Sequence, residues 1–464
     1  MSTSKKPLQR RSEATAIITD GHIWTAVWYL AWPSVISTVM ASLYNFINRM
    51  FLAHVPNAQD ALAASGIGGN ALNFQMALTF GLSAGTAALV SRFLGEERIE
   101  DAEQAARQSL IVSVIAAILT GVPLALSARF LVELIGAKDA VIPLAASYTA
   151  IISWASIPLF INFIATTVLR SQGDVRSPLF AGGTMILVNV LLDWLLIFGF
   201  WHVPAMGIRG AALATGISRL VGTTLTLYFL RRSILGGALS HWRLDLSWLG
   251  RILWIGWPAS VQNVIWSVSS ALFMRILSML PSGQSTAAQA AYTVALTVES
   301  LAFQPGIAYS MAATPLVGQN LGAGKPDRAA HSAWVATGQA VVIMTLTGAT
   351  FLLIPHSLAA PFSKDAALVP IIVAYLRINS FSEPFLALNM VLRGALQGAG
   401  DTIVPMIITG SSLLLIRVPL AWLFAIHLRM GAAGAWWAVS LTCCLSGILM
   451  MLWFRTGGWR NRQV

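Results

Sequence analysis

The chain has 464 residues, of which 56% are hydrophobic and only 10% are charged, and its mean hydropathy is +0.71. Soluble domains average about 25% charged residues, so this composition excludes a soluble protein and predicts an integral membrane protein. A net charge of +11 would suggest nucleic-acid binding in a soluble protein. Here the basic residues follow a membrane pattern, and we expect no nucleic-acid partner.

Long apolar stretches follow one another along the whole chain. Each is long enough to cross a hydrocarbon core of about 30 Å, and several are longer, so tilted or kinked helices are expected. The sequence therefore predicts an all-α polytopic protein that spans the lipid bilayer. The twelve predicted spans are 24–53, 62–94, 108–128, 141–169, 178–201, 207–230, 249–280, 287–320, 331–354, 366–396, 404–427 and 431–454.

Lysine and arginine are distributed unequally between the two sides of these spans. Of the 29 basic residues, nineteen lie on the side of both termini, including the single arginine at 393. Five lie on the opposite side, and five lie within spans: Arg49, Arg219, Arg275, Arg377 and Arg417. Because cytoplasmic loops are enriched in basic residues, we predict that both termini are cytoplasmic, in a bacterial inner membrane.

The two halves of the chain repeat each other at a nearly constant offset. Trp257-Pro258 follows Trp32-Pro33 by 225 residues, Gly400-Asp401 follows Gly173-Asp174 by 227, and Met430-Gly431 follows Met206-Gly207 by 224. Six spans per half make the repeat parallel. The predicted architecture is two six-helix lobes around a central V-shaped cleft, which favours a transporter. The predicted segments are a tail 1–23, an N-lobe 24–230, a linker 231–248, a C-lobe 249–454 and a tail 455–464.

A carboxylate lies in the middle of the apolar span 178–201. Asp193 and Asn189 are four residues apart in VNVLLDWLLIFG, and so lie on one helix face. A charge at this depth costs at least a few kcal/mol, so Asp193 has either a buried partner, such as Arg49, or a function. A carboxylate in a low dielectric also holds its proton more tightly than in water. Proton and cationic substrate can then compete for it, which is the minimum required for antiport.

The second half has its own polar residues within spans. Glu299 and Glu383 are functional candidates because acids inside a membrane usually are. The alternative is that each pairs with Arg275, Arg377 or Arg417 and holds the lobe together. Gln262 and Asn263 are candidates to line a cleft, together with aromatic residues such as Tyr44, Trp194, Trp266 and Phe303. Pro33 and Pro258 interrupt helical hydrogen bonding, as static kinks or as hinges.

Several ordered motifs resemble the multidrug and toxic compound extrusion (MATE) family of prokaryotic efflux transporters. They are LAWPSVISTVMASLYNFIN (30–48), GLSAGTAALVSRFLGEE (81–97), LRSQGDVRSP (169–178), NVLLDWLLIFG (189–199), GIRGAALATGISR (207–219), GIAYSMAATPLVGQNLGAGKPDRA (306–329) and GALQGAGDTIVPM (394–406). The resemblance covers roughly residues 24–455. It implies twelve helices in two lobes, and export of organic cations or amphipathic compounds in exchange for H⁺ or Na⁺.

The resemblance also implies an N-lobe cation site at Asn189 and Asp193. Family members usually add an aspartate on the first helix, at the position of Asn48 here. Asparagine can coordinate Na⁺ through its carbonyl oxygen but cannot titrate, and Na⁺ prefers negatively charged oxygen ligands. We therefore favour H⁺ over Na⁺ as the coupling ion. The hydroxyls of Thr215 and Ser218 are further candidate ligands.

Two other functions remain as alternatives. One is a flippase or exporter of a lipid-linked or other anionic metabolite, for which the arginines within spans could serve. The other is an integral-membrane enzyme, but no paired acids, nucleophile–base pair or histidine–cysteine metal cluster is recognisable. No GxxxxGK[ST] phosphate loop is present, so ATP should not drive the chain directly. We expect no cofactor, no resident metal and a monomer.

Overall fold

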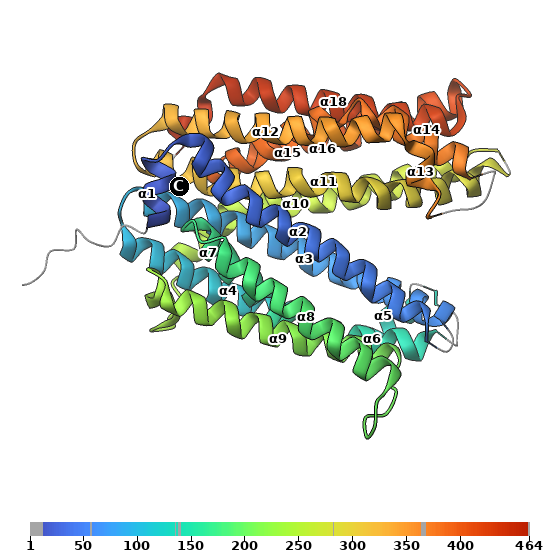
Figure 1. Cartoon of the computed structure of the whole chain (residues 1–464), viewed down its shortest axis with the longest axis horizontal. Coiled ribbons are helices and arrows are strands. Elements are labelled where there is room, and N and C mark those ends of the chain that lie inside the picture. Colours follow the sequence, from blue (N-terminus) through green and yellow to red (C-terminus); the bar gives the residue numbers. More distant parts are fainter. Residues whose placement is uncertain are drawn as a thin grey trace, which may run out of the picture. The chain divides into compact units, whose positions relative to one another are not determined.

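The computed structural model describes residues 13–55, 58–134, 136–137, 141–281, 283–362 and 368–462. The described chain is almost entirely helical (Figure 1). The helices of the first half are α1 (Glu13–Thr19), α2 (Ile23–Ala53), α3 (Ala58–Gly95), α4 (Ile99–Leu126), α5 (Ala128–Leu134), α6 (Ile142–Trp154), α7 (Ser156–Ser171), α8 (Arg176–Phe198) and α9 (Ile208–Arg232).

The second half begins after a short 3₁₀ turn, η2 (Gly236–Leu239). Its helices are α10 (Leu246–Ser278), α11 (Gln284–Gly322), α12 (Pro326–Leu353), α13 (Pro355–Ala359), α14 (Val369–Ser380), α15 (Glu383–Gly398), α16 (Ile403–Gly410), α17 (Val418–Trp422) and α18 (Gly431–Thr456). The π-helical segment η3 (Ser411–Arg417) joins α16 to α17, and a second one, η4 (Leu423–His427), continues α17, so that Ile403–His427 forms one span. A final 3₁₀ turn, η5 (Gly458–Asn461), follows α18.

The predicted spans correspond to long helices or to bent helix pairs. In the described residues, eight helices are long and apolar enough to cross a membrane, or up to ten if each bent pair is one span. The pairs are α6 with α7, bent by 43°, and α14 with α15, bent by 59°. The remaining two predicted spans are α10 and α11, which are 33 and 39 residues long.

The sharper bend, between α14 and α15, occurs at a proline. Pro384 is the second residue of α15 and has no backbone N–H, so α14 cannot continue through it. The Ser382 hydroxyl donates to the carbonyl oxygen of Asn379 at 2.8 Å, which closes the end of α14. Glu383 is consequently the first residue of a new helix, and its side chain is fully buried.

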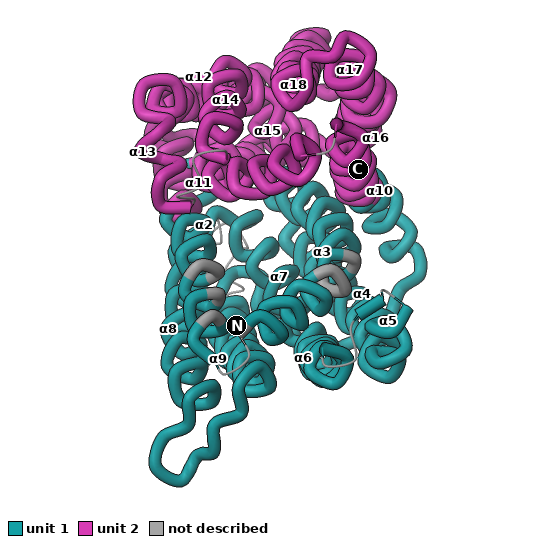
Figure 2. Tube along the Cα trace, turned by 90° about the vertical axis from the view of Figure 1, so that its right-hand side faces the viewer, with its two compact units in different colours: residues 1–17, 36–260 teal, residues 18–35, 261–464 magenta. Residues whose placement is uncertain are grey.

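The chain forms two compact units, which Figure 2 colours separately. Unit 1 consists of residues 1–17 and 36–260, and unit 2 consists of residues 18–35 and 261–464. Helices α2 and α10 therefore each contribute to both units. In each of them the last residue before the change of unit, Val35 in α2 and Ser260 in α10, is two residues after the internal proline, Pro33 or Pro258.

Each unit is held by close helix packing. In unit 1, α8 packs on α9 and α3 packs on α4 and α6. Gly256 of α10 meets α3 so closely that a Cβ there would lie 2.4 Å from the carbonyl oxygen of Gly81. In unit 2, α15 packs on α11, α12 and α18. Its core contains the stacked rings of Tyr292 and Trp436, with centroids 5.6 Å apart.

The repeat predicted from the sequence recurs in the backbone. Gly173 and Gly400 both have positive φ, 90° and 81°, a conformation that glycine adopts without steric cost. The next residue closes the same turn in both halves, since the amide of Asp174 donates to Leu169 and that of Asp401 to Leu396. These turns shape the ends of α7 and α15.

Candidate functional site

The polar face of α8 is buried within unit 1. Asn189 and Asp193 are 1% and 0% exposed, although α8 is otherwise largely apolar. The Asn189 amide nitrogen donates to the hydroxyl of Ser218 on α9, at 3.2 Å. Ser218 in turn donates to the carbonyl oxygen of Thr215 at 3.0 Å. Asn189 of α8 thus contacts one of the predicted hydroxyls of α9, that of Ser218.

Four buried oxygen atoms near this face have no hydrogen-bond partner among the described residues. They are both carboxylate oxygens of Asp193 and the amide oxygens of Asn189 and Asn48. An unsatisfied polar group in an apolar interior costs free energy, and an unpaired charge costs more. Oxygen atoms of this kind are what a proton or a hard cation requires. The arrangement is suited to exchanging such an ion.

Tyr44 connects the helices around the acid. Its phenol interacts with the side chains of Asn48 and Thr215, and it lies within the electrostatic field of Asp193 and Arg219. The hydroxyl of Thr215 donates to the carbonyl oxygen of Ala211 at 2.9 Å, so its oxygen can still accept or coordinate. Residues of α2, α8 and α9 therefore surround one polar region, to which the sequence analysis assigned Asn48 and Thr215.

The basic residue beside this region is one that the sequence analysis did not assign to the site. Arg219 on α9 interacts electrostatically with Tyr44 and Tyr148, and its Nη1 has no hydrogen-bond partner among the described residues. No ion pair joins Asp193 to any described residue. Arg49, the predicted alternative partner, has a side chain outside the described residues.

The two acids of unit 2 differ from each other. Glu299 is buried, and its Oε2 accepts a hydrogen bond of 2.5 Å from the Tyr375 hydroxyl. The predicted alternative of an ion pair with an arginine is not found in the described part, although Glu299 lies in the field of Arg417. Glu383 is near Glu299, and neither of its carboxylate oxygens has a described hydrogen-bond partner.

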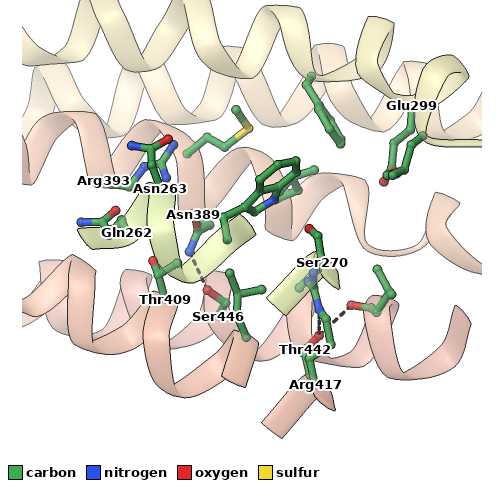
Figure 3. Close-up of a pocket in the computed structure, with 18 of the residues that line it drawn as sticks. Gln262, Asn263, Ser270, Glu299, Asn389, Arg393, Thr409, Arg417, Thr442 and Ser446 are labelled. Carbon is green, nitrogen blue, oxygen red and sulfur yellow. Dashed lines mark hydrogen bonds between the residues drawn. The ribbon is translucent and has the colours of Figure 1, made fainter. Parts of the chain in front are cut away.

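A cavity of about 390 Å³ opens within unit 2 (Figure 3). The predicted residues Gln262, Asn263 and Glu299 all line it, as do the aromatic residues Trp266 and Phe303. Its other lining residues are Ser270, Tyr292, Leu296, Tyr375, Leu386, Asn389, Met390, Arg393, Thr409, Leu413, Arg417, Val439, Thr442, Cys443 and Ser446. Glu383 does not line this cavity, and Trp194 is half-exposed on α8.

Two arginines in this cavity were not identified as lining residues from the sequence. Arg417 ends the π-helical segment η3 and donates to the Thr442 hydroxyl at 3.0 Å and the Cys443 sulfur at 3.3 Å. Arg393 was counted with the loop residues, but it lies inside α15 and faces the cavity. Its position four residues after Asn389 indicates one polar helix face, which is the signal that could have identified it.

Comparison with known proteins supports the predicted family. The family model described as MatE matches residues 33–195 and 258–423. These two matches begin 225 residues apart, at the two prolines. The chain is 29% identical over 446 residues to "Probable multidrug resistance protein NorM" of Thermotoga maritima, with 94% of this chain and 93% of that protein covered. It is 26% identical over 422 residues to "FAD transporter" of Shewanella oneidensis, with 90% and 91% covered.

A solved structure confirms the fold. It is described as the outward-facing conformation of a multidrug resistance MATE family transporter of the MOP superfamily, with a TM-score of 0.91 at 22% identity. The match covers 98% of this chain and 100% of that one. The predicted all-α architecture of twelve membrane-spanning helices is thereby confirmed. Since the family model matches more than half of the residues, the chain belongs to the MatE family and is a multi-pass membrane transporter, not an enzyme.

Proposed function

We propose that this transporter is a secondary active multidrug antiporter, which exports organic cations or amphipathic compounds in exchange for H⁺ or Na⁺. The observation that carries the proposal is the buried carboxylate of Asp193, which has no described partner. Such a group is costly unless a ligand occupies it for part of the cycle. The multidrug name of the Thermotoga relative supports the same transport class.

The residues around Asp193 favour a proton over Na⁺. The region has one carboxylate, and Asn48 replaces the second acid expected from the family resemblance. A single proton neutralises Asp193, and the neutral acid can donate to an amide oxygen of Asn48 or Asn189, both of which lack described partners. Na⁺ would use the same oxygens as ligands but would find only one negative charge. The ion is in either case transported, and no resident cofactor is assigned.

Alternating access then requires the two states of Asp193 to favour different conformations. The ionised acid attracts a cationic substrate, and protonation removes that attraction. Pro33 and Pro258, at the two points where a helix passes from one unit to the other, are the proposed hinges. We further propose a bacterial inner-membrane location with both termini in the cytoplasm, and function as a monomer.

The test is efflux of a fluorescent organic cation from proteoliposomes under an imposed pH gradient or an imposed Na⁺ gradient. The wild type is compared with Asp193→Asn, which keeps the side-chain size and removes the charge. We expect efflux under the pH gradient alone and its loss in the variant. Efflux driven only by Na⁺ would show that Na⁺ is the coupling ion. Full efflux by Asp193→Asn would refute the role of this residue.

A second candidate function is export of an anionic metabolite. The specific observation is that Arg393 and Arg417 both line the cavity of unit 2, where a cationic substrate would be repelled. The Shewanella relative is named as a transporter of FAD, a molecule with a diphosphate. Efflux of an organic anion, measured in the same proteoliposomes, separates this candidate from the first.

A further inference from the structure

The cavity of unit 2 has an unbalanced positive charge at one end. In Figure 3, Gln262, Asn263, Thr409 and Arg393 lie toward one end, and Ser270, Thr442 and Arg417 lie toward the other. Gln262 and Ser270 are eight residues apart on α10, which corresponds to about 12 Å along a helix. The two guanidinium groups therefore belong to different ends of the same cavity.

The charge of Arg417 is partly offset within the protein. Its guanidinium donates to Thr442 and Cys443, and it interacts electrostatically with Glu299, which also lines the cavity. Arg393 has no such neighbour. Among the described residues, no hydrogen bond or ion pair joins its side chain to another group, and no acidic residue other than Glu299 lines the cavity. A guanidinium without a counter-charge, facing a cavity, is a site for an anion.

The lining beside Arg393 contains further hydrogen-bond donors. The hydroxyl of Thr409 is buried and has no described partner, and the amide of Gln262 faces the same cavity. Hydroxyl and amide groups of this kind can donate to the oxygens of a carboxylate or phosphate. The rest of the lining includes the aromatic rings of Trp266, Phe303 and Tyr292, and flat apolar surfaces of this kind stack on an aromatic ligand.

We propose that the cavity of unit 2 binds an aromatic organic anion, with its carboxylate or phosphate on Arg393 and its ring against Trp266. The volume of about 390 Å³ lies within the range of small-molecule sites. This proposal rests on the second candidate function, the export of an anionic metabolite, and gives that function a binding site and a ligand class. It concerns equilibrium binding to the cavity, whereas the candidate function concerns transport.

The test is isothermal titration calorimetry on the full chain in lipid nanodiscs, without any ion gradient. The probes share one ring: 1-naphthoate, 1-naphthyl phosphate and 1-naphthylmethylammonium. Arg393→Gln removes the charge, Arg393→Lys keeps the charge but not the planar fork, and Arg377→Gln is the matched control. Arg377 is an exposed arginine of α14 in the same unit, outside the cavity lining.

We expect at least one of the two anions to bind the wild type and Arg377→Gln equally, and the preferred anion to identify carboxylate or phosphate chemistry. Arg393→Gln should weaken that binding by roughly 30-fold or more, as for loss of one partner of a buried charge pair. The affinity of Arg393→Lys for that anion should lie between the affinities of the wild type and Arg393→Gln. If Arg393→Gln does not fold, the affinity of Arg393→Lys tests the proposal instead. Equal anion binding by the Arg393 variants and the wild type, tighter binding of the ammonium probe, or no binding of either anion would overturn the proposal. Because no gradient is present, this result is independent of the coupling role assigned to Asp193.

Discussion

The hydrogen bond between Tyr375 and Glu299 allows a direct test of why that acid is buried. Tyr375 is 1% exposed, and its hydroxyl donates to Glu299 Oε2 at 2.5 Å. Tyr375→Phe removes only the hydroxyl. The ring can still pack on Trp436, with centroids 5.1 Å apart, and on Tyr292, with centroids 5.9 Å apart. Any loss of stability therefore reports the hydrogen bond.

The expected loss follows from the chemistry of the acceptor. A hydrogen bond to a charged group contributes about 1.5–3 kcal/mol, and one to a neutral group about 1 kcal/mol. If Glu299 is ionised, Tyr375→Phe should thus cost about 2 kcal/mol. For a unit of 150–250 residues, each kcal/mol lowers the unfolding temperature by about 2–4 °C. We expect a decrease of about 4–8 °C in a thermal unfolding experiment in detergent.

A matched control is Tyr309→Phe. Tyr309 is also 1% exposed and belongs to the same unit, but its hydroxyl has no hydrogen bond to the described residues. It should change the unfolding temperature by less than about 2 °C, because only a hydroxyl without a partner is lost. If the two variants lose equal stability, the bond to Glu299 contributes nothing specific, and the acid must be explained by another interaction.

Two further predictions concern packing and motion. Gly210→Ala should destabilise the protein by about 1–3 kcal/mol, because the new Cβ would lie 2.4 Å from the carbonyl oxygen of Leu196. Gly66→Ala serves as the control, because a Cβ at that position would meet no atom within 4 Å. Thermal unfolding measures the stability of both variants. Pro258→Ala should restore a helical hydrogen bond and slow gradient-driven efflux several-fold without lowering the unfolding temperature. Pro326→Ala, at the start of α12, is its control, and equal efflux rates in wild type and Pro258→Ala would exclude a hinge.

The helices were predictable from the sequence because their main determinant is local. A run of about 20 apolar residues is sufficient to identify a membrane span, and the predicted limits lie close to the helix ends, except that α4 begins at Ile99, well before the predicted start at residue 108. The break at Pro384 was predictable for the same reason, since proline acts on its own helix. The bend between α6 and α7 at Ala155 was not predicted, although Pro158 in the first turn of α7 has no N–H to donate to Trp154 and could have marked it.

The candidate sites were only partly predictable, because their members come from distant parts of the chain. Asn189 and Asp193 were identified by their spacing and by the cost of a charge within a span. The partner of Glu299 is 76 residues away in the sequence, and the sequence analysis considered only arginines as alternative partners. Arg393 was taken for a loop residue, since charge counts contain no information on which way a side chain faces.

Asp193 and Glu383 are equally buried, and both lack a described hydrogen-bond partner, yet their surroundings predict different roles. Glu383 is the first residue of α15, where the helix dipole favours a negative charge. The side chain of Glu383 packs against Gly348. A Cβ added at Gly348 would lie 3.2 Å from the Cβ of Glu383. Asp193 lies in the interior of α8, among amide and hydroxyl groups of other helices, and has no such stabilisation. Glu383→Gln should therefore keep at least half of the gradient-driven efflux rate in the proteoliposome assay, whereas Asp193→Asn should abolish it. Loss of coupled efflux in a folded Glu383→Gln variant would mean that unit 2 also takes part in ion exchange.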